Sequence, residues 1–104
     1  MATKNIVVLE KSPFQDKLQV AITIAPTWED FEKLVQFLIH EYNAEVSKRY
    51  DGPDARRWIL EAKGQTLEMW HDHPYGNYLV APTDGAEVLV RKIAQDLKER
   101  LGNL

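Results

Sequence analysis

The sequence predicts a single α+β domain, a two-layer sandwich in which two helices pack on one face of an antiparallel β-sheet of about six strands. Segments with strand-like alternation and segments with helical periodicity follow each other in the order ββαββββα. Short turns join consecutive strands, which favours antiparallel pairing. The length of 104 residues suits one domain, and no linker or internal repeat divides residues 1–104.

A leading hairpin is predicted at the amino-terminal end. The β-branched run within Lys4–Glu10 predicts the first strand, and the segment Ser12–Asp16, which contains Pro13, predicts a turn. The segment Lys17–Ala25 alternates in a way that is typical of a half-buried second strand. Its apolar positions on one side are Leu18, Val20, Ile22 and Ile24.

The first helix is predicted to begin after Thr27 and to run to about Tyr42. The Thr27 hydroxyl can accept a hydrogen bond from the backbone near Asp30, and acidic residues suit the positive end of the helix dipole. Asn43 favours the end of the helix. One stripe with spacings of three and four predicts the buried face, which consists of Trp28, Phe31, Leu34, Val35, Leu38 and Tyr42.

Four more strands and a second helix complete the prediction. Lys63 and Gly64 predict a two-residue hairpin turn. The segment Pro82–Asp84 is predicted to cap the last helix, Asp84 and Glu87 have the spacing of a capping box, and Gly102 is placed to end that helix. The element order is similar to those of helix-grip and TATA-binding-protein-like folds, a topological similarity that implies no function. The strands are expected at Ala44–Tyr50, Arg56–Ala62, Gln65–Asp72 and Asn77–Ala81.

The composition excludes several classes of protein. The chain has no cysteine, which excludes disulfides, thiolate zinc sites and a cysteine nucleophile and fits a reducing compartment. The net charge of -3 and the pI near 5.6 argue against nucleic acid as the main partner. No apolar run has the length of a signal-peptide core or of a membrane span. These features predict a soluble cytoplasmic protein that needs no cofactor and does not engage a membrane.

The sheet face opposite the helices is the first candidate for function. Alternation along the strands places Trp70, Tyr78, Ile59 and Val80 on this face, which makes it unusually apolar for a solvent-exposed surface. The pattern predicts a small non-catalytic binding protein that acts as a homodimer or with another protein partner. The alternative is that one strand is shifted by one residue, which places the same side chains in the core.

The segment Trp70–Pro74 is the second candidate. On an extended strand His71 and His73 project to the same side, which is a workable spacing for metal ligands, and Asp72 or Tyr75 beside them suits acid–base chemistry. This alternative makes the chain a small metal-binding protein or an enzyme. The competing interpretation is ordinary turn chemistry. The absence of established metal-binding and nucleophile motifs favours a protein that is not an enzyme.

Two charged clusters give further hypotheses. Lys48, Arg56 and Arg57 lie near aromatic residues, a pattern that can bind an anion, although acidic neighbours make cross-strand ion pairs the simpler account. The acidic residues of the first helix are typical of a solvated face, and they also suit an immunity-type or antitoxin-type inhibitor of a basic protein. These acidic residues are Glu29, Asp30, Glu32 and Glu41.

Overall fold

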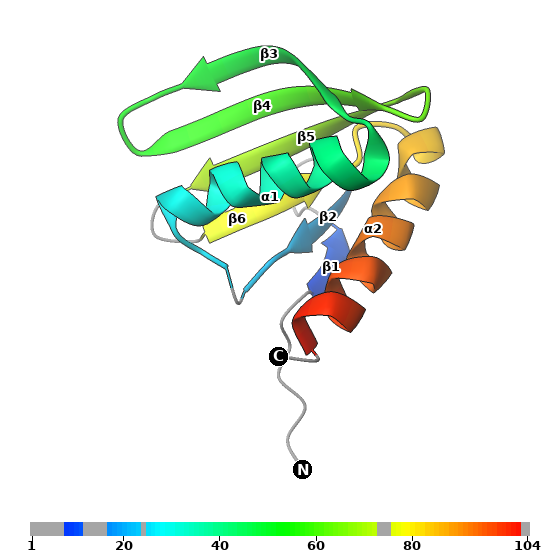
Figure 1. Ribbon diagram of the computed structural model, residues 1–104. Helices are drawn as coiled ribbons and strands as arrows, with labels where there is room; N and C mark the ends of the chain where they lie inside the picture. Colours follow the sequence, from blue (N-terminus) through cyan, green and yellow to red (C-terminus); the bar gives the residue numbers. More distant parts are fainter. Residues whose placement is uncertain (1–7, 12–16, 24, 73–75, 103–104) are drawn as a thin grey trace.

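The computed structural model of the protein describes residues 8–11, 17–23, 25–72 and 76–102. They form one antiparallel sheet and two helices, which confirms the predicted α+β class. Both helices lie on the same face of the sheet, and the strand order across it is β1-β2-β6-β5-β4-β3 (Figure 1). The elements are β1 (Val8–Lys11), β2 (Leu18–Ala21), α1 (Trp28–Tyr42), β3 (Glu45–Asp51), β4 (Ala55–Ala62), β5 (Gln65–Asp72), β6 (Gly76–Val80) and α2 (Asp84–Gly102).

Helix α1 is delimited by its capping residues. Thr27 Oγ1 accepts a hydrogen bond from the backbone N–H of Asp30 at 3.1 Å, and the Asp30 carboxylate accepts one from the backbone N–H of Thr27 at 3.2 Å. This reciprocal pair is a capping box. At the other end Asn43 adopts the left-handed conformation, with φ at 53°, and stops the helix. The predicted helix is confirmed, with Trp28 half-buried and the rest of its apolar stripe buried.

Helix α2 is capped by Thr83, which lies within the segment predicted to cap it. The Thr83 hydroxyl accepts a hydrogen bond from the backbone N–H of Ala86 at 3.2 Å, so Thr83 is the N-cap residue and the predicted capping box of Asp84 and Glu87 is wrong. Both acidic residues lie instead in the first turn, where their charges favour the positive end of the helix dipole. Neither described helix combines the length and the hydropathy needed to cross a membrane.

Strand β2 is shorter than predicted. It covers Leu18–Ala21 and not the whole of Lys17–Ala25, because the chain turns where the backbone N–H of Ala25 donates to the carbonyl oxygen of Ile22 at 3.2 Å. The turn redirects the chain towards the cap of α1. Outside the described residues lie residues 4–7 of the predicted first strand, the predicted turn Ser12–Asp16 and Ile24.

The turn between β4 and β5 consists of Lys63 and Gly64, which confirms the predicted hairpin. Both residues have positive φ, 53° for Lys63 and 78° for Gly64. Two consecutive left-handed residues give a turn whose twist matches that of the flanking antiparallel strands. Gly64 adopts this conformation at little cost, whereas Lys63 carries a side chain in a backbone region that disfavours it.

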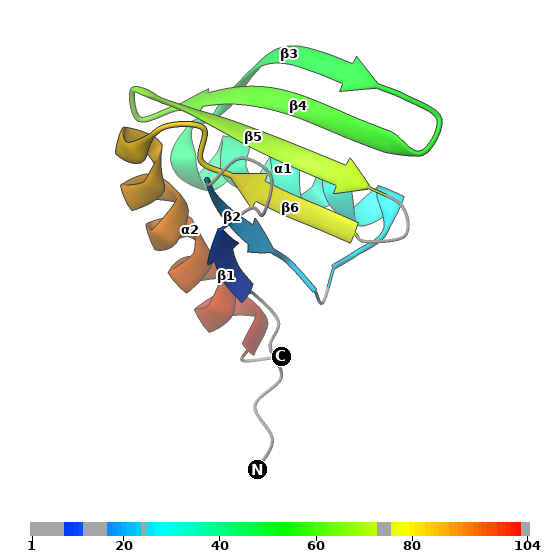
Figure 2. The same cartoon turned by 180° about the vertical axis from the view of Figure 1, so that it is seen from behind.

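The core lies between the helices and the sheet. Met69 of β5 is the partner of Trp58 on β4 and of Leu79 on β6, and Leu79 is the partner of Val20 on β2. Except for Trp58, these side chains are at most 1% exposed, so the strands align their apolar residues in rows beneath the helices. Leu67, which lies two positions before Met69 on β5, is also fully buried. Figure 2 shows the opposite face, which neither helix covers.

Strand β3 is an edge of the sheet. Figure 1 shows it outside the area that α1 and α2 cover, and its residues are exposed apart from the half-buried Val46. The register with β4 shifts between Val46 and Lys48, so that Ser47 is an extra residue. The Ser47 hydroxyl donates to the carbonyl oxygen of Ile59 at 3.1 Å. After this bulge Lys48 and Tyr50 project to the face that the helices leave uncovered.

Candidate functional site

The helix-free side of the sheet, called the open face below, carries the residues predicted for a contact surface. Trp70 and Tyr78 are direct partners across β5 and β6. Ile59 of β4 and Val80 of β6 are both partners of Glu68, one on each side of β5. Because partners in neighbouring strands project to the same face, the structure brings these side chains together.

An unbroken row of aromatic and arginine side chains crosses the open face. The register places Tyr50, Arg57, Trp70 and Tyr78 opposite one another on β3, β4, β5 and β6, and we call them the aromatic row. The guanidinium carbon of Arg57 lies 4.8 Å from the centre of the Tyr50 ring and 5.5 Å from that of the Trp70 ring. Cation–π contacts therefore join three of the strands on this face.

Glu68 contacts the two middle side chains of the aromatic row, Arg57 and Trp70. Its Oε1 atom accepts a hydrogen bond from the indole N–H of Trp70 at 3.0 Å and lies 3.9 Å from Nε of Arg57. The Arg57 Nε atom is buried and makes no hydrogen bond, so the contact with Glu68 is an ion pair only. The Glu68 side chain is 18% exposed, which reduces solvent screening of its charge. One carboxylate thus orients both Trp70 and Arg57.

Exposure differs along the open face. Tyr50 is 48% exposed, whereas Val80 is 7% exposed, and Ile59, Trp70 and Tyr78 are half-buried. The part of the face that a partner can reach therefore lies towards β3 and β4. Val80 is buried, so little of its side chain is accessible on this face. Tyr50 was missing from the predicted surface, because the bulge at β3 interrupts the alternation that would have revealed it.

The basic residues of the predicted anion patch do not lie together. Lys48 and Arg57 belong to the open face, whereas Arg56 belongs to the helix-covered face. The guanidinium carbon of Arg56 lies 3.7 Å from the centre of the Trp28 ring, and its Nη1 atom lies 3.3 Å from the Glu32 carboxylate. An acidic neighbour and a tryptophan on α1 therefore engage Arg56 within the protein.

A second stack of arginine and aromatic side chains lies at the margin of the helix-covered face. Arg56 lies between Trp28 and Trp58, and the guanidinium carbon of Arg49 lies 4.4 Å from the centre of the Trp58 ring. The indole N–H of Trp58 donates to Asp51 at 2.7 Å. A hollow of about 810 Å³ borders Trp28, Trp58 and Arg49. The stack fixes the outer part of β3 and β4 against the start of α1.

His71 is part of a polar network in the core. Its side chain is 5% exposed, and its Nδ1 atom lies 2.8 Å from Oδ1 of Asn77. The amide nitrogen of Asn77 donates to the carbonyl oxygens of Ala25 and Thr27 at 2.6 and 3.0 Å. Since the amide oxygen is left as the acceptor, we assign the proton to Nδ1 of His71. The Trp28 ring packs edge-on against the imidazole, with the ring centres 5.2 Å apart.

Two residues of the predicted metal or acid–base site, His71 and Asp72, lie on opposite faces of the sheet. Asp72 is still paired within β5 and is exposed, and adjacent strand residues project to opposite faces, so its carboxylate lies on the open face while His71 lies beneath α1. His73 and Tyr75 lie outside the described residues. In the described part of the chain, no three His, Cys, Asp or Glu side chains are grouped so that they could hold a metal ion.

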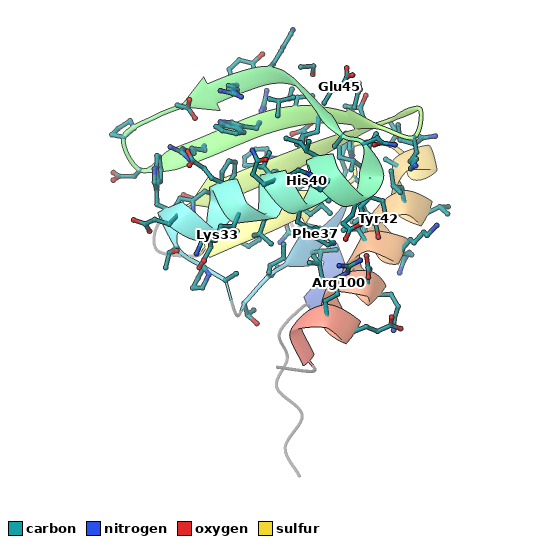
Figure 3. All side chains as sticks on the ribbon, in the orientation of Figure 1. Lys33, Phe37, His40, Tyr42, Glu45 and Arg100 are labelled. Atoms are coloured by element: carbon teal, nitrogen blue, oxygen red, sulfur yellow. The ribbon has the colours of Figure 1, made fainter. Side chains whose placement is uncertain are left out.

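A polar network that the sequence did not reveal joins α1 to α2. The Tyr42 hydroxyl donates to Asp96 at 2.9 Å, and Arg100 donates to the same carboxylate at 2.8 Å and pairs with Glu41 at 2.9 Å. Figure 3 shows Phe37, Tyr42 and Arg100 where the two helices approach each other. Burial and the hydrogen bond to Asp96 raise the pKa of Tyr42 to about 12, and the hydrogen bond from Arg100 lowers the pKa of Asp96.

Comparison with known proteins places the chain in a family. A family model described as "Protein of unknown function (DUF3630)" matches residues 10–99. No curated protein and no solved structure matches the chain. The matched range includes the whole aromatic row, the His71 network and most of α2. The chain therefore belongs to the DUF3630 family of proteins of unknown function.

Proposed function

We propose that the protein acts by binding another protein molecule, either a second copy of itself or a different protein, through the open face and not by catalysis. The observation that supports this proposal is the aromatic row, Tyr50, Arg57, Trp70 and Tyr78, which crosses four adjacent strands. Tyrosine, tryptophan and arginine are the residue types that contribute most to the free energy of protein association.

The aromatic row is also held in place before any partner arrives. Arg57 lies between the rings of Tyr50 and Trp70, and Trp70 is hydrogen-bonded to Glu68. Side chains that already have a fixed arrangement lose less conformational entropy when a partner binds. Half-burial of Trp70 and exposure of Tyr50 give this row both rigidity and access.

The charges of the open face favour a protein over a nucleic acid as the partner. Lys48 and Arg57 share the face with the carboxylates of Glu61, Glu68 and Asp72. A phosphate backbone would be repelled by these carboxylates, since nucleic-acid binding relies on an uninterrupted basic surface. A protein surface can match both signs of charge.

Site-specific photo-crosslinking in the cells that naturally produce the protein tests this proposal. A photoreactive phenylalanine analogue replaces Tyr50 on the open face or Val88 on α2. These two residues are the exposed large hydrophobic residues of the described chain, at 48% and 75% exposure, so Val88 is a matched control on a different surface. We expect a crosslinked adduct of defined mass from position 50 and none from position 88.

The yield of this adduct should fall when Arg57→Ala is introduced into the chain that carries the probe at position 50. The reason is that Arg57 orders the neighbouring rings. Circular dichroism and thermal unfolding verify that each variant is folded. Absence of any adduct at position 50, or equal adducts at positions 50 and 88, would overturn the proposal. The mass of the adduct shows whether the partner is a second copy or a different protein.

A further inference from the structure

We infer that the partner on the open face is a second copy of the chain, related by a two-fold axis that passes through Ile59 and lies diagonal to the strands. This inference rests on the proposed function and adds the identity of the partner and the geometry of the contact. It follows from the arrangement of charges around Ile59, the half-buried apolar residue at the centre of the reachable part of the open face.

Four charged residues surround Ile59 in a cross. Lys48 on β3 and Glu68 on β5 are its direct partners in register. Arg57 and Glu61 precede and follow Ile59 by two positions in β4, so they project to the same face. Neighbouring strands are about 4.8 Å apart and alternate residues about 6.7 Å apart, which gives the arms of the cross comparable lengths. The two positive residues, Lys48 and Arg57, occupy adjacent arms of the cross. The two negative residues, Glu61 and Glu68, occupy the other two arms.

A face-to-face dimer with two-fold symmetry places each arm of the cross against an arm of its partner. An axis along β4 places Arg57 against Arg57 and Glu61 against Glu61. An axis perpendicular to β4 places Lys48 against Lys48 and Glu68 against Glu68. The diagonal axis that passes between Lys48 and Arg57 places these two cations against each other. Each of these arrangements therefore has like charges in contact, which disfavours association.

The remaining diagonal satisfies all four charges. An axis through Ile59 that passes between Arg57 and Glu68 places Lys48 against Glu61 of the second copy and Arg57 against Glu68 of the second copy. Ile59 then meets Ile59, and Trp70, which occupies the corner between Arg57 and Glu68, lies next to its own equivalent. The strands of the two sheets cross at about 90° in this arrangement, which is one of the two usual geometries of sheet packing.

A like-charge pair within the chain supports the same arrangement. Glu45 and Glu61 are direct partners in register on β3 and β4, where two carboxylates repel each other. In the described part of the chain neither of them forms an ion pair, and Lys48 forms none either. The diagonal two-fold axis brings Lys48 of the second copy to this acidic pair. Glu45 occupies the corner between Lys48 and Glu61, so it lies on the axis beside its own equivalent, flanked by the Lys48 ammonium groups of both copies.

Paired charge reversals test this geometry. Sedimentation velocity across a dilution series measures the dissociation constant of the unaltered chain, of Lys48→Glu, of Glu61→Lys and of an equimolar mixture of the two variants. Each variant alone has like charges at two symmetric contacts and should associate at least about tenfold more weakly. In the mixture, the introduced carboxylate of one chain meets the introduced ammonium group of the other, while the unaltered Lys48 and Glu61 also meet, so association should return. Lys98→Glu on α2 is the matched control and should leave association unchanged.

Three results would overturn the inference. They are a monomer at every concentration of the unaltered chain, single variants that associate as well as the unaltered chain, and a mixture that associates no better than the single variants. Crosslinking at Tyr50 separates this failure from failure of the proposed function. An adduct with a different protein from a monomeric chain leaves the open face as the binding surface and rejects only the second copy. Absence of any adduct at position 50 rejects both the proposed function and the second copy as the partner.

Discussion

Nδ1 of His71 lies 2.8 Å from the side-chain oxygen of Asn77, and both residues are buried, at 5% and 2% exposure. The contact joins β5 to β6, and the Asn77 amide extends it to the backbone of Ala25 and Thr27 just before α1. A network of this kind in the core holds the chain in one arrangement only if every member is satisfied. Through this network His71 contributes to holding β5, β6 and the start of α1 together.

Replacement of Asn77 should destabilise the protein strongly. Asn77→Ala leaves the His71 N–H and the carbonyl oxygens of Ala25 and Thr27 without this partner, at an expected cost of about 2–4 kcal/mol in the free energy of unfolding. Urea unfolding measures the change. Thr66→Ala, which removes a hydrogen bond to Glu61 near the surface, is the control and should cost less than about 1 kcal/mol. Equal losses in the two variants would contradict a structural role of the network.

The Tyr42 hydroxyl should make stability depend on alkaline pH. Its pKa is raised from 10.0 to about 12, so the unfolded chain releases this proton at a lower pH than the folded chain. The unfolded state then binds fewer protons between these two values, and the free energy of unfolding must fall as the pH rises through this range. The contribution of Tyr42 is complete below pH 10 and lost by about pH 12.

Tyr42→Phe isolates that contribution from the other groups that titrate in alkali. Urea unfolding of both chains at a series of pH values should show a steeper loss of stability in the unaltered chain than in the variant. Parallel pH profiles would show that the bond from Tyr42 to Asp96 does not stabilise the neutral hydroxyl.

Lysine should not be able to replace Arg56 without a loss of stability. The planar guanidinium of Arg56 stacks 3.7 Å from the Trp28 ring centre and reaches both Glu32 and Asp51. A lysine ammonium cannot reproduce this stacking and the paired contacts, so Arg56→Lys should lower the free energy of unfolding by about 1–2 kcal/mol. Thermal or urea unfolding gives the value. Arg91→Lys on the exposed surface of α2 should change stability by less than about 0.5 kcal/mol, and an equal effect would refute the stacking argument.

The hairpin turn between β4 and β5 offers a stabilising substitution. Lys63 has φ at 53°, and asparagine tolerates this conformation better in a two-residue turn. Lys63→Asn should therefore raise the free energy of unfolding by about 0.5–1 kcal/mol. Gly64→Ala should lower it by about 1 kcal/mol through backbone strain alone, since an added Cβ at Gly64 meets no atom within 4 Å. A loss of stability in Lys63→Asn would show that the Lys63 side chain makes a contact that matters.

Local signals allowed several parts of the structure to be predicted from the sequence. Thr27 and Asp30 lie three positions apart and form a capping box within one turn, so the start of α1 required no tertiary information. Alternation along β5 and β6 likewise placed Trp70 and Tyr78 on one face. At α2 two adjacent residues can each serve as a cap, and the hydroxyl of Thr83 takes the role that had been given to Asp84.

Other parts depend on contacts that alternation and periodicity do not encode. Tyr42 and Asp96 are 54 positions apart, and only the packing of α1 beside α2 brings them together. The partner of His71 was equally hidden, because alternation does not show which residue of β6 lies opposite it. The role of Tyr50 depends on the extra residue in β3, which changes the face to which the strand projects without a clear mark in the sequence.

That extra residue at Ser47 also protects the molecule against growth into fibres. An exposed edge strand offers unpaired backbone groups on which further strands can be added without limit. The bulge breaks the regular spacing of these groups between Val46 and Lys48, so a straight incoming strand cannot pair along the whole of β3. Open-ended stacking at this edge is therefore disfavoured.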